Sequence, residues 1–352
     1  MTNPPEVVEG RRSSTHSGRP GPVEWRRRLL TAVYALGGAA LFAYVVRRTG
    51  VAEIIGGIQR VGWGLAAILA LAGLRFALRT VCWRLCMAPG MKLTFGQALS
   101  AFLAGDAVGS VTPLGWLASE PTKVFLTRHH LATRESVASL AVENLVYAAS
   151  VVAMVAIGLA VVLAEVPLTA AWRWWIGGAL IGMLAAGSLG FRLLGGTWDD
   201  RRGERPRWRE RLAGIRLAVV GFSAVHPGRL RLAFILDLGF HLLGVVEVFL
   251  TLRWLFGDRS PTLAQAVAFE ALNRIVTVAF KFVPFRIGVD EALSGALAPM
   301  LAVSPSAGVS LAVVRKVRSL FWSAVGLGII AAHPAQTTRA TGPRGTAPSH
   351  RT

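Results

Sequence analysis

The sequence predicts an all-α fold, a polytopic bundle of transmembrane helices. Three observations lead to this class: 53% of the residues are hydrophobic and 16% are charged, the mean hydropathy is +0.51, and the apolar residues gather in long runs. A soluble protein with a solvated surface is less apolar than this. The bilayer is therefore the expected solvent of most of the chain.

Six apolar runs have the length of a membrane helix, which needs about 20 residues to cross roughly 30 Å of hydrocarbon. They cover residues 29–46, 61–83, 136–164, 174–194, 231–256 and 306–332. Two further apolar segments, 95–130 and 262–303, are broken by prolines that include Pro113 and Pro284. Each broken segment is either a re-entrant hairpin or a bent pair of spans, and both alternatives add an even number of crossings.

Both ends of the chain differ from the apolar middle. Residues 1–24 and 334–352 are rich in Pro, Gly, Ser and Arg, so they cannot bury enough apolar surface to become ordered. The sequence therefore predicts a disordered basic tail (1–24), a transmembrane domain (25–333) and a second disordered tail (334–352).

The basic residues indicate the orientation in the membrane. Lys and Arg number 38 against 19 Asp and Glu, but they cluster between apolar runs, which favours membrane topology over nucleic-acid binding. The most basic stretch, 192–231, is expected in the cytoplasm because cytoplasmic loops carry the excess of Lys and Arg. Counting crossings from this loop places both termini in the cytoplasm, with the helices in the cytoplasmic (inner) membrane.

The two broken segments align with each other, which predicts an internal repeat. The Thr-x-x-Gln-Ala pattern at 94–98 returns at 262–266, and the segment 139–142, Ser-Leu-Ala-Val, returns at 310–313. Pro113 and Glu120 match Pro284 and Glu291 in the register of that tetrapeptide. Because three crossings separate repeat one (about 94–164) from repeat two (about 262–332), the repeat is inverted, as in many transporters.

Several charged residues fall deep inside predicted spans. Glu143 lies about two turns inside its span, whereas Arg315, Lys316 and Arg318 lie about three turns inside the last one. A charge near the bilayer centre costs about 2.5 to 3.5 kcal/mol on insertion scales, so such groups face a cavity or a partner. We expect Glu143 to approach Arg315 and Lys316, either as a structural ion pair or as part of a headgroup or proton site.

The broken segments carry charges of their own. Ser119-Glu120-Pro121 has the pattern of a helix start, and the exposed amides of such a start bind phosphate well beside Lys or Arg. Snorkelling to the membrane interface is the alternative for Lys123 and Lys281. The predicted substrate-binding residues are Glu120, Lys123, Glu143, Lys281, Arg286, Glu291, Arg315, Lys316 and Arg318.

Other patterns carry less information. Glu270 and Arg274 have the spacing of a local ion pair, and Cys82 and Cys86 have that of packing residues. Asp237 and His241, with Glu247 further along the span, are weak evidence for a metal site. The sequence contains no phosphate-binding loop, nucleophile elbow or dinucleotide fingerprint. We therefore expect no enzyme activity, no cofactor and no metal.

The broken segments resemble the paired motifs of the lysylphosphatidylglycerol synthase transmembrane region, a flippase-like family. The resemblance rests on Ser119-Glu120-Pro121-x-Lys123, on Glu143, and on Pro284-x-x-x-Gly288-Val289-x-Glu291-Ala292, and it covers roughly residues 25–333. Family members often have Arg in place of Asn144 and Gly in place of Arg286. The resemblance implies a domain that moves lipids between leaflets and acts in cell-envelope pathways, here without the soluble aminoacyl-transfer domain.

These observations favour a translocase of lipids or lipid-linked intermediates that has no ATPase of its own. Its partner would be a membrane lipid with an anionic headgroup or a lipid-linked intermediate. The alternative is a membrane scaffold or accessory subunit whose basic loop, 192–231, recruits an envelope-lipid biosynthetic enzyme. A membrane-embedded transferase is disfavoured because no catalytic constellation is evident.

The predicted topology is testable by labelling. Cysteines placed at Gly203 and Pro167 are expected to react from opposite faces of the membrane, with Gly203 cytoplasmic, because the basic loop and the six crossings require it. Impermeant maleimide applied to spheroplasts and to inverted vesicles measures the accessibility of each site. Labelling of both cysteines from the same face would contradict the topology and the inverted repeat.

Overall fold

A computed structural model describes residues 55, 56, 59, 61–112, 115–166, 169–195, 220–256, 261–280, 283–286, 288–301 and 303–332. Within these ranges the chain forms helices joined by turns and loops, without strands. The prediction of an all-α helical bundle is confirmed.

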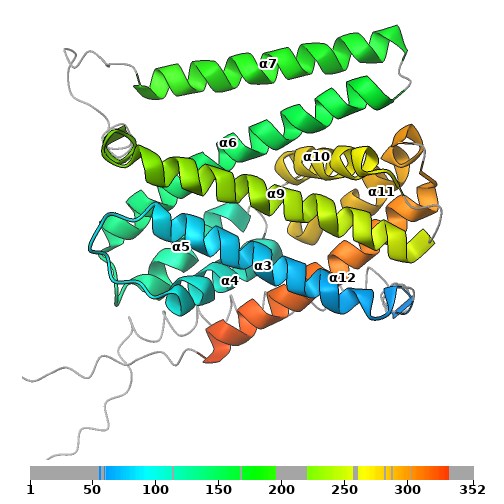
Figure 1. The fold of residues 1–352 in the computed structure, drawn as a ribbon. Coiled ribbons are helices and arrows are strands. Elements are labelled where there is room, and N and C mark those ends of the chain that lie inside the picture. Colours follow the sequence, from blue (N-terminus) through cyan, green and yellow to red (C-terminus); the bar gives the residue numbers. More distant parts are fainter. Residues whose placement is uncertain are drawn as a thin grey trace, which may run out of the picture.

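The long helices match the predicted apolar runs, apart from 29–46, which lies outside the described residues. They are α3 (Gly64–Leu85), α6 (Thr133–Glu165), α7 (Ala170–Gly195), α9 (Pro227–Phe256) and α12 (Pro305–Ala332) (Figure 1). By length and composition, three of the described helices can cross a membrane: α3, α6 and α9 as far as Leu255. The middle of α12 carries Arg315, Lys316 and Arg318, which lower its hydropathy.

The two broken segments begin with the same local structure. Helices α4 (Phe95–Val111) and α10 (Leu263–Ala279) have 17 residues each and start at a capping box. At α4 the Thr94 hydroxyl accepts from the Gln97 amide over 3.3 Å, and the Gln97 side chain accepts from the Thr94 amide over 3.0 Å. Thr262 and Gln265 form the same pair at α10, at 3.2 and 2.7 Å. The matching sequence therefore encodes a matching helix start.

After this start the two segments differ. Helix α5 (Gly115–Thr127) follows α4, whereas α10 is followed by the 3-10 helix η2 (Pro284–Arg286), α11 (Val289–Leu297) and the 3-10 helix η3 (Pro299–Leu301). Because η2 contacts α4, the two broken segments approach each other inside the bundle. Pro113, which was expected to face Pro284, lies outside the described residues.

The predicted start of α5 was wrong. The helix begins at Gly115 and contains Pro121 in its interior, although Ser119-Glu120-Pro121 has the pattern of a first turn. Close packing explains the earlier start, because Gly105 and Gly109 of α4 lie directly against the backbone of α5. A side chain at Gly115 would collide with the Gly109 backbone. Burial of this helix pair outweighs the local signal at Pro121.

The hairpins begin at opposite ends of the bundle. Helices α3 and α9 are antiparallel neighbours, because Arg229 at the start of α9 donates to the Arg84 backbone oxygen over 3.2 Å, while Gly64 at the start of α3 lies against Trp254. Since α4 follows α3 and α10 follows α9, the α4–α5 and α10–α11 hairpins enter from opposite ends (Figure 1). An inverted repeat requires this arrangement, and the repeat itself stays a prediction.

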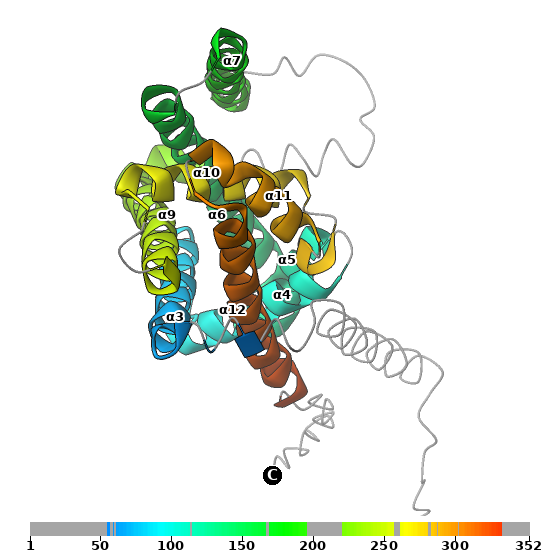
Figure 2. The ribbon, with the colours of Figure 1, turned by 90° about the vertical axis from the view of Figure 1, so that its right-hand side faces the viewer.

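Each hairpin packs on the last helix of the other predicted repeat. Helix α4 lies along α12, and α10 lies along α6. Viewed end-on, α12 runs between the α3–α9 pair and helices α4 and α11 (Figure 2). Both crossings depend on glycine: Gly326 of α12 lies against Leu103 and Ala107 of α4, and Gly158 of α6 lies against Ala271 of α10. Small residues let helix backbones approach closely in membranes.

The glycine crossing predicts a position-specific loss of stability. A Cβ added at Gly326 would lie 2.4 Å from the Leu103 backbone oxygen, so Gly326→Ala is expected to destabilise the protein by about 1–3 kcal/mol. Gly328→Ala is the matched control, because a Cβ there meets nothing within 4 Å. Thermal unfolding in detergent measures both, and equal melting of the two variants would contradict the close crossing.

Candidate functional site

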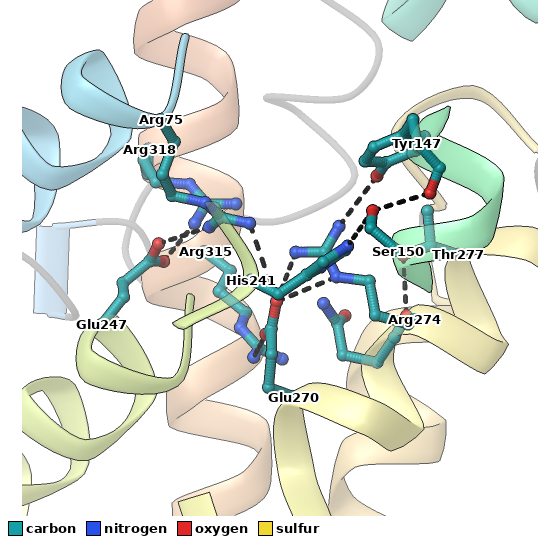
Figure 3. Close-up of polar contacts among 11 residues, drawn as sticks. Arg75, Tyr147, Ser150, His241, Glu247, Glu270, Arg274, Thr277, Arg315 and Arg318 are labelled. Carbon is teal, nitrogen blue, oxygen red and sulfur yellow. Dashed lines mark hydrogen bonds and ion pairs between the residues drawn. The ribbon is translucent and has the colours of Figure 1, made fainter. Parts of the chain in front are cut away.

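Helices α3, α9, α10 and α12 bring a group of charged side chains together in the interior. Arg75 of α3, Arg274 of α10, and Arg315 and Arg318 of α12 surround Glu247 of α9 and Glu270 of α10 (Figure 3). We call these six residues the arginine cluster. Arg75 lies 2.9 Å from Glu247 and 3.6 Å from Glu270, and Arg315 lies 3.0 Å from Glu270. Arg274 also pairs with Glu270, and Arg318 with Glu247.

The arginine cluster holds more positive than negative charge. Its two glutamates are each 1% exposed, Arg75, Arg274 and Arg315 are buried, and Arg318 is partly buried. Four guanidinium groups therefore share two carboxylates. A buried charge is stable only with partners, and an excess of buried cations creates a strong local preference for an anion.

A second group has the opposite excess. Arg79, one turn after Arg75 on α3, lies 2.6 Å from Glu143 of α6 and 3.6 Å from Asp237 of α9. We call these three residues the acidic cluster. Both carboxylates are fully buried, and within the described residues their four oxygen atoms contact only Arg79 and, at Asp237, the Cys82 thiol as polar partners. Two carboxylates therefore share one guanidinium.

The acidic cluster corrects a prediction. Glu143 was expected to approach Arg315 and Lys316, but it pairs with Arg79, while Arg315 pairs with Glu270. The alignment covers only the two predicted repeats, whereas Arg79 comes from α3, which lies outside both. Sequence analysis missed Arg75 and Arg79, although two arginines inside a predicted span are a signal of the same kind as Glu143. Glu270 and Arg274 form the local ion pair that their spacing predicted.

Two aromatic side chains lie between the clusters. The Arg79 guanidinium carbon is 3.6 Å from the centre of the Tyr147 ring, and that of Arg75 is 4.3 Å from the centre of the Phe240 ring. These rings meet edge to face at 5.8 Å. Arg274 donates to the Tyr147 hydroxyl over 3.4 Å, so Tyr147 touches both clusters. Cation–π contacts hold both arginines against this aromatic pair.

The predicted residues on the hairpins form separate ion pairs. Lys123 lies 2.9 Å from Glu120, and its ammonium nitrogen is 4.2 Å from the centre of the Phe102 ring. Because the residue is 3% exposed, the snorkelling alternative for Lys123 was wrong. Lys316 pairs with Glu291, and Arg286 lies 2.8 Å from Asp290. Lys281 lies outside the described residues.

The break in the second hairpin carries unusual backbone angles. Phe285 and Arg286 both have φ of 46°, in the left-handed region that favours glycine. Arg286 is also the position at which the resemblance to the flippase-like family led us to expect glycine. The ion pair with Asp290 holds this arginine in a conformation that a glycine would adopt without strain.

A small pocket adjoins the arginine cluster between α10, α11 and α12. Asn273, Asp290, Ser294 and Arg315 give it a polar lining. Its volume of about 10 Å³ has room for about one water molecule. In this conformation the pocket is therefore too small for a lipid headgroup.

The described residues contain no group of three or more His, Cys, Asp or Glu side chains arranged to hold a metal ion. His241 lies 3.1 Å from the Ser150 hydroxyl and stacks on Tyr147 instead of facing acidic ligands. Both cysteines are buried, and the Cys82 thiol donates to the Ala233 backbone oxygen over 3.4 Å. They occupy packing positions between α3 and α9.

Comparison with protein families gives a direct match. The family model of the lysylphosphatidylglycerol synthase TM region covers residues 29–328. The chain belongs to this family. It is thus a membrane protein of a family that handles lipids, and the arginine and acidic clusters lie within the matched region. No curated protein and no solved structure matches the chain.

Loss of a shared carboxylate should destabilise the interior. Glu270→Gln leaves Arg274 and Arg315 without their ionised partner, so we expect a loss of about 3–5 kcal/mol. Glu165→Gln, at the exposed end of α6, should stay within about 0.5 kcal/mol of the wild type. Thermal unfolding in detergent compares the two variants, and a Glu270→Gln variant that melts with the control would show that these ion pairs do not support the fold.

Proposed function

We propose that this protein translocates a lipid or lipid-linked intermediate with an anionic headgroup between the leaflets of the cytoplasmic membrane, without an ATPase of its own. The observation that carries the proposal is the arginine cluster, in which four buried or partly buried arginines share two glutamates. Family membership supports a role in lipid handling.

The chemistry of the cluster favours a phosphate-containing headgroup. The planar guanidinium fork binds phosphate oxygens through two parallel hydrogen bonds, and these bonds are strong where water is excluded. A cluster that needed only to hold helices together would balance its charges, because an uncompensated cation inside a membrane protein is costly. The positive excess is therefore best explained by an anion that occupies the cluster during transport.

The arrangement of the helices supports alternating access. The arginine cluster is built from α3, α9, α10 and α12, and the hairpins that flank the bundle interior begin at opposite ends. In transporters with inverted repeats, two half-structures exchange roles and open one central site to either face. We infer that the closed pocket beside Arg315, which lies between α10, α11 and α12, widens when the second hairpin moves against α12. The proposal includes an inverted repeat, a membrane domain at 25–333 and both termini in the cytoplasm.

Among the predicted substrate-binding residues, Arg315, Lys316 and Arg318 are central to this proposal. All three lie within one turn in the middle of α12, where Arg315 and Arg318 belong to the arginine cluster. Glu120, Lys123, Arg286 and Glu291 lie on the hairpins and pair locally or with Lys316. We propose that these residues take part in the movement of the hairpins and do not bind the headgroup. Glu143 belongs to the acidic cluster.

The arginine cluster is tested by removing one of its cations. Arg315→Gln leaves Glu270 paired with Arg274 and Arg75, so folding is expected to suffer less than in Glu270→Gln. Translocation of fluorescent anionic lipids in proteoliposomes should fall about tenfold, equivalent to ~1.4 kcal/mol in the barrier. Arg84→Gln, exposed at the end of α3, serves as the control for the loss of an arginine.

The wild type is tested with several lipids that carry anionic or zwitterionic headgroups. If it translocates none of them, the scaffold alternative is favoured. Unchanged translocation by Arg315→Gln would contradict the assignment of the headgroup to the arginine cluster.

A further inference from the structure

The two clusters carry opposite charge excesses at close range. Arg75 and Arg79 are one helical turn apart on α3, and each belongs to a different cluster. The arginine cluster has more cations than carboxylates, whereas Glu143 and Asp237 share only Arg79. Because the interior has a low dielectric constant, the positive excess of one cluster and the negative excess of the other attract each other across the aromatic pair Tyr147 and Phe240.

The carboxylates of the acidic cluster are poised to accept a proton. Both side chains are 0% exposed, and in the described part of the chain their oxygens have no polar partners beyond Arg79 and the Cys82 thiol beside Asp237. Several nearby groups leave the charge balance unchanged. Lys123 and Glu120 on α5 form a neutral pair, Cys82 and Cys86 on α3 are thiols, and Tyr147 and His241 on α6 and α9 add no carboxylate. Asp106 on α4 adds one further carboxylate, which interacts with Arg79 and Lys123.

Occupation of the arginine cluster changes this balance. Because Arg75 is one helical turn from Arg79, the positive excess of the arginine cluster should favour the ionised forms of Glu143 and Asp237, and an anionic headgroup would remove that support. Two buried carboxylates that share one guanidinium cannot both stay charged once that support is lost, so one of them takes up a proton. The step forms one O–H bond on a carboxylate oxygen and breaks one O–H bond of a hydronium ion, which leaves a water molecule on the side to which the interior is open.

We propose that Glu143 and Asp237 bind one proton between them when an anionic headgroup occupies the arginine cluster, so that lipid and proton cross the membrane together. This coupling rests on the proposed function and supplies an energy source for it, the proton gradient. Linkage makes the effect reciprocal: a lower pH strengthens headgroup binding by the same factor by which the headgroup strengthens proton binding.

Each carboxylate can be removed without leaving Arg79 unpaired. Glu143→Gln keeps Asp237 beside Arg79, and Asp237→Asn keeps Glu143, so each variant holds a neutral pair. Both single variants are therefore expected to fold. Removing both carboxylates together would leave a buried cation without a partner, and that double variant is expected to melt well below either single variant.

The experiment measures proton uptake upon binding. Full-length protein in detergent is titrated with short-chain phosphatidylglycerol in weakly buffered solution at neutral pH, with calorimetry for binding and an indicator dye for protons. We expect the wild type and Glu165→Gln to take up close to one proton for each lipid bound. Glu143→Gln and Asp237→Asn should bind the lipid with little or no uptake. Short-chain phosphatidylcholine, which has no net charge, should cause no uptake.

The outcomes separate the two proposals. Lipid binding by the wild type without proton uptake would overturn the coupling and leave the proposed function standing. Equal uptake in the wild type and both single variants would also overturn it. Absence of any anion binding would overturn the coupling and the anion site together. Uptake with dimethyl phosphate as well as with the lipid would support the coupling and identify the phosphodiester group as the ligand.

Discussion

The structure depends on the neutralisation of charge inside the bundle, because the bilayer offers no water to do it. Among the described residues, the two clusters, the three hairpin ion pairs described above and Asp106 together comprise eight basic and eight acidic side chains. The basic ones are Arg75, Arg79, Lys123, Arg274, Arg286, Arg315, Lys316 and Arg318, and the acidic ones are Asp106, Glu120, Glu143, Asp237, Glu247, Glu270, Asp290 and Glu291. The set is balanced as a whole but unevenly distributed, with positive charge in excess on one side of Tyr147 and Phe240 and negative charge in excess on the other.

This balance requires helices that are distant in sequence to meet. Helix α3 presents Arg75 to α9 and α10, and Arg79 to α6 and α9, so it joins both clusters. Close packing keeps water out of the contacts: Gly326 and Gly158 let α4 lie against α12 and α10 against α6. Packing and electrostatics therefore act together, since a looser bundle would admit water and weaken every ion pair.

The sequence predicted the helices well, because membrane spans and capping boxes are local signals. The predicted run 306–332 became α12, and the Thr-Gln boxes at Thr94 and Thr262 start α4 and α10. Pairing between helices was predicted poorly, because it depends on tertiary geometry. Glu143 was matched to the right kind of partner, an arginine, but Arg79 of α3 supplies it in place of Arg315. The start of α5 was misplaced for a similar reason, since packing against Gly109 outweighs the signal at Pro121.

The central claim is that the arginine cluster receives an anionic headgroup. An experimental structure of the protein in nanodiscs rich in anionic phospholipid tests it most directly. The account predicts density for a phosphate group enclosed by α3, α9, α10 and α12, within hydrogen-bond distance of Arg75 or Arg315, in a conformation with a wider pocket. Anionic lipid found only around the outside of the bundle, with all four arginines still confined to Glu247 and Glu270, would contradict it.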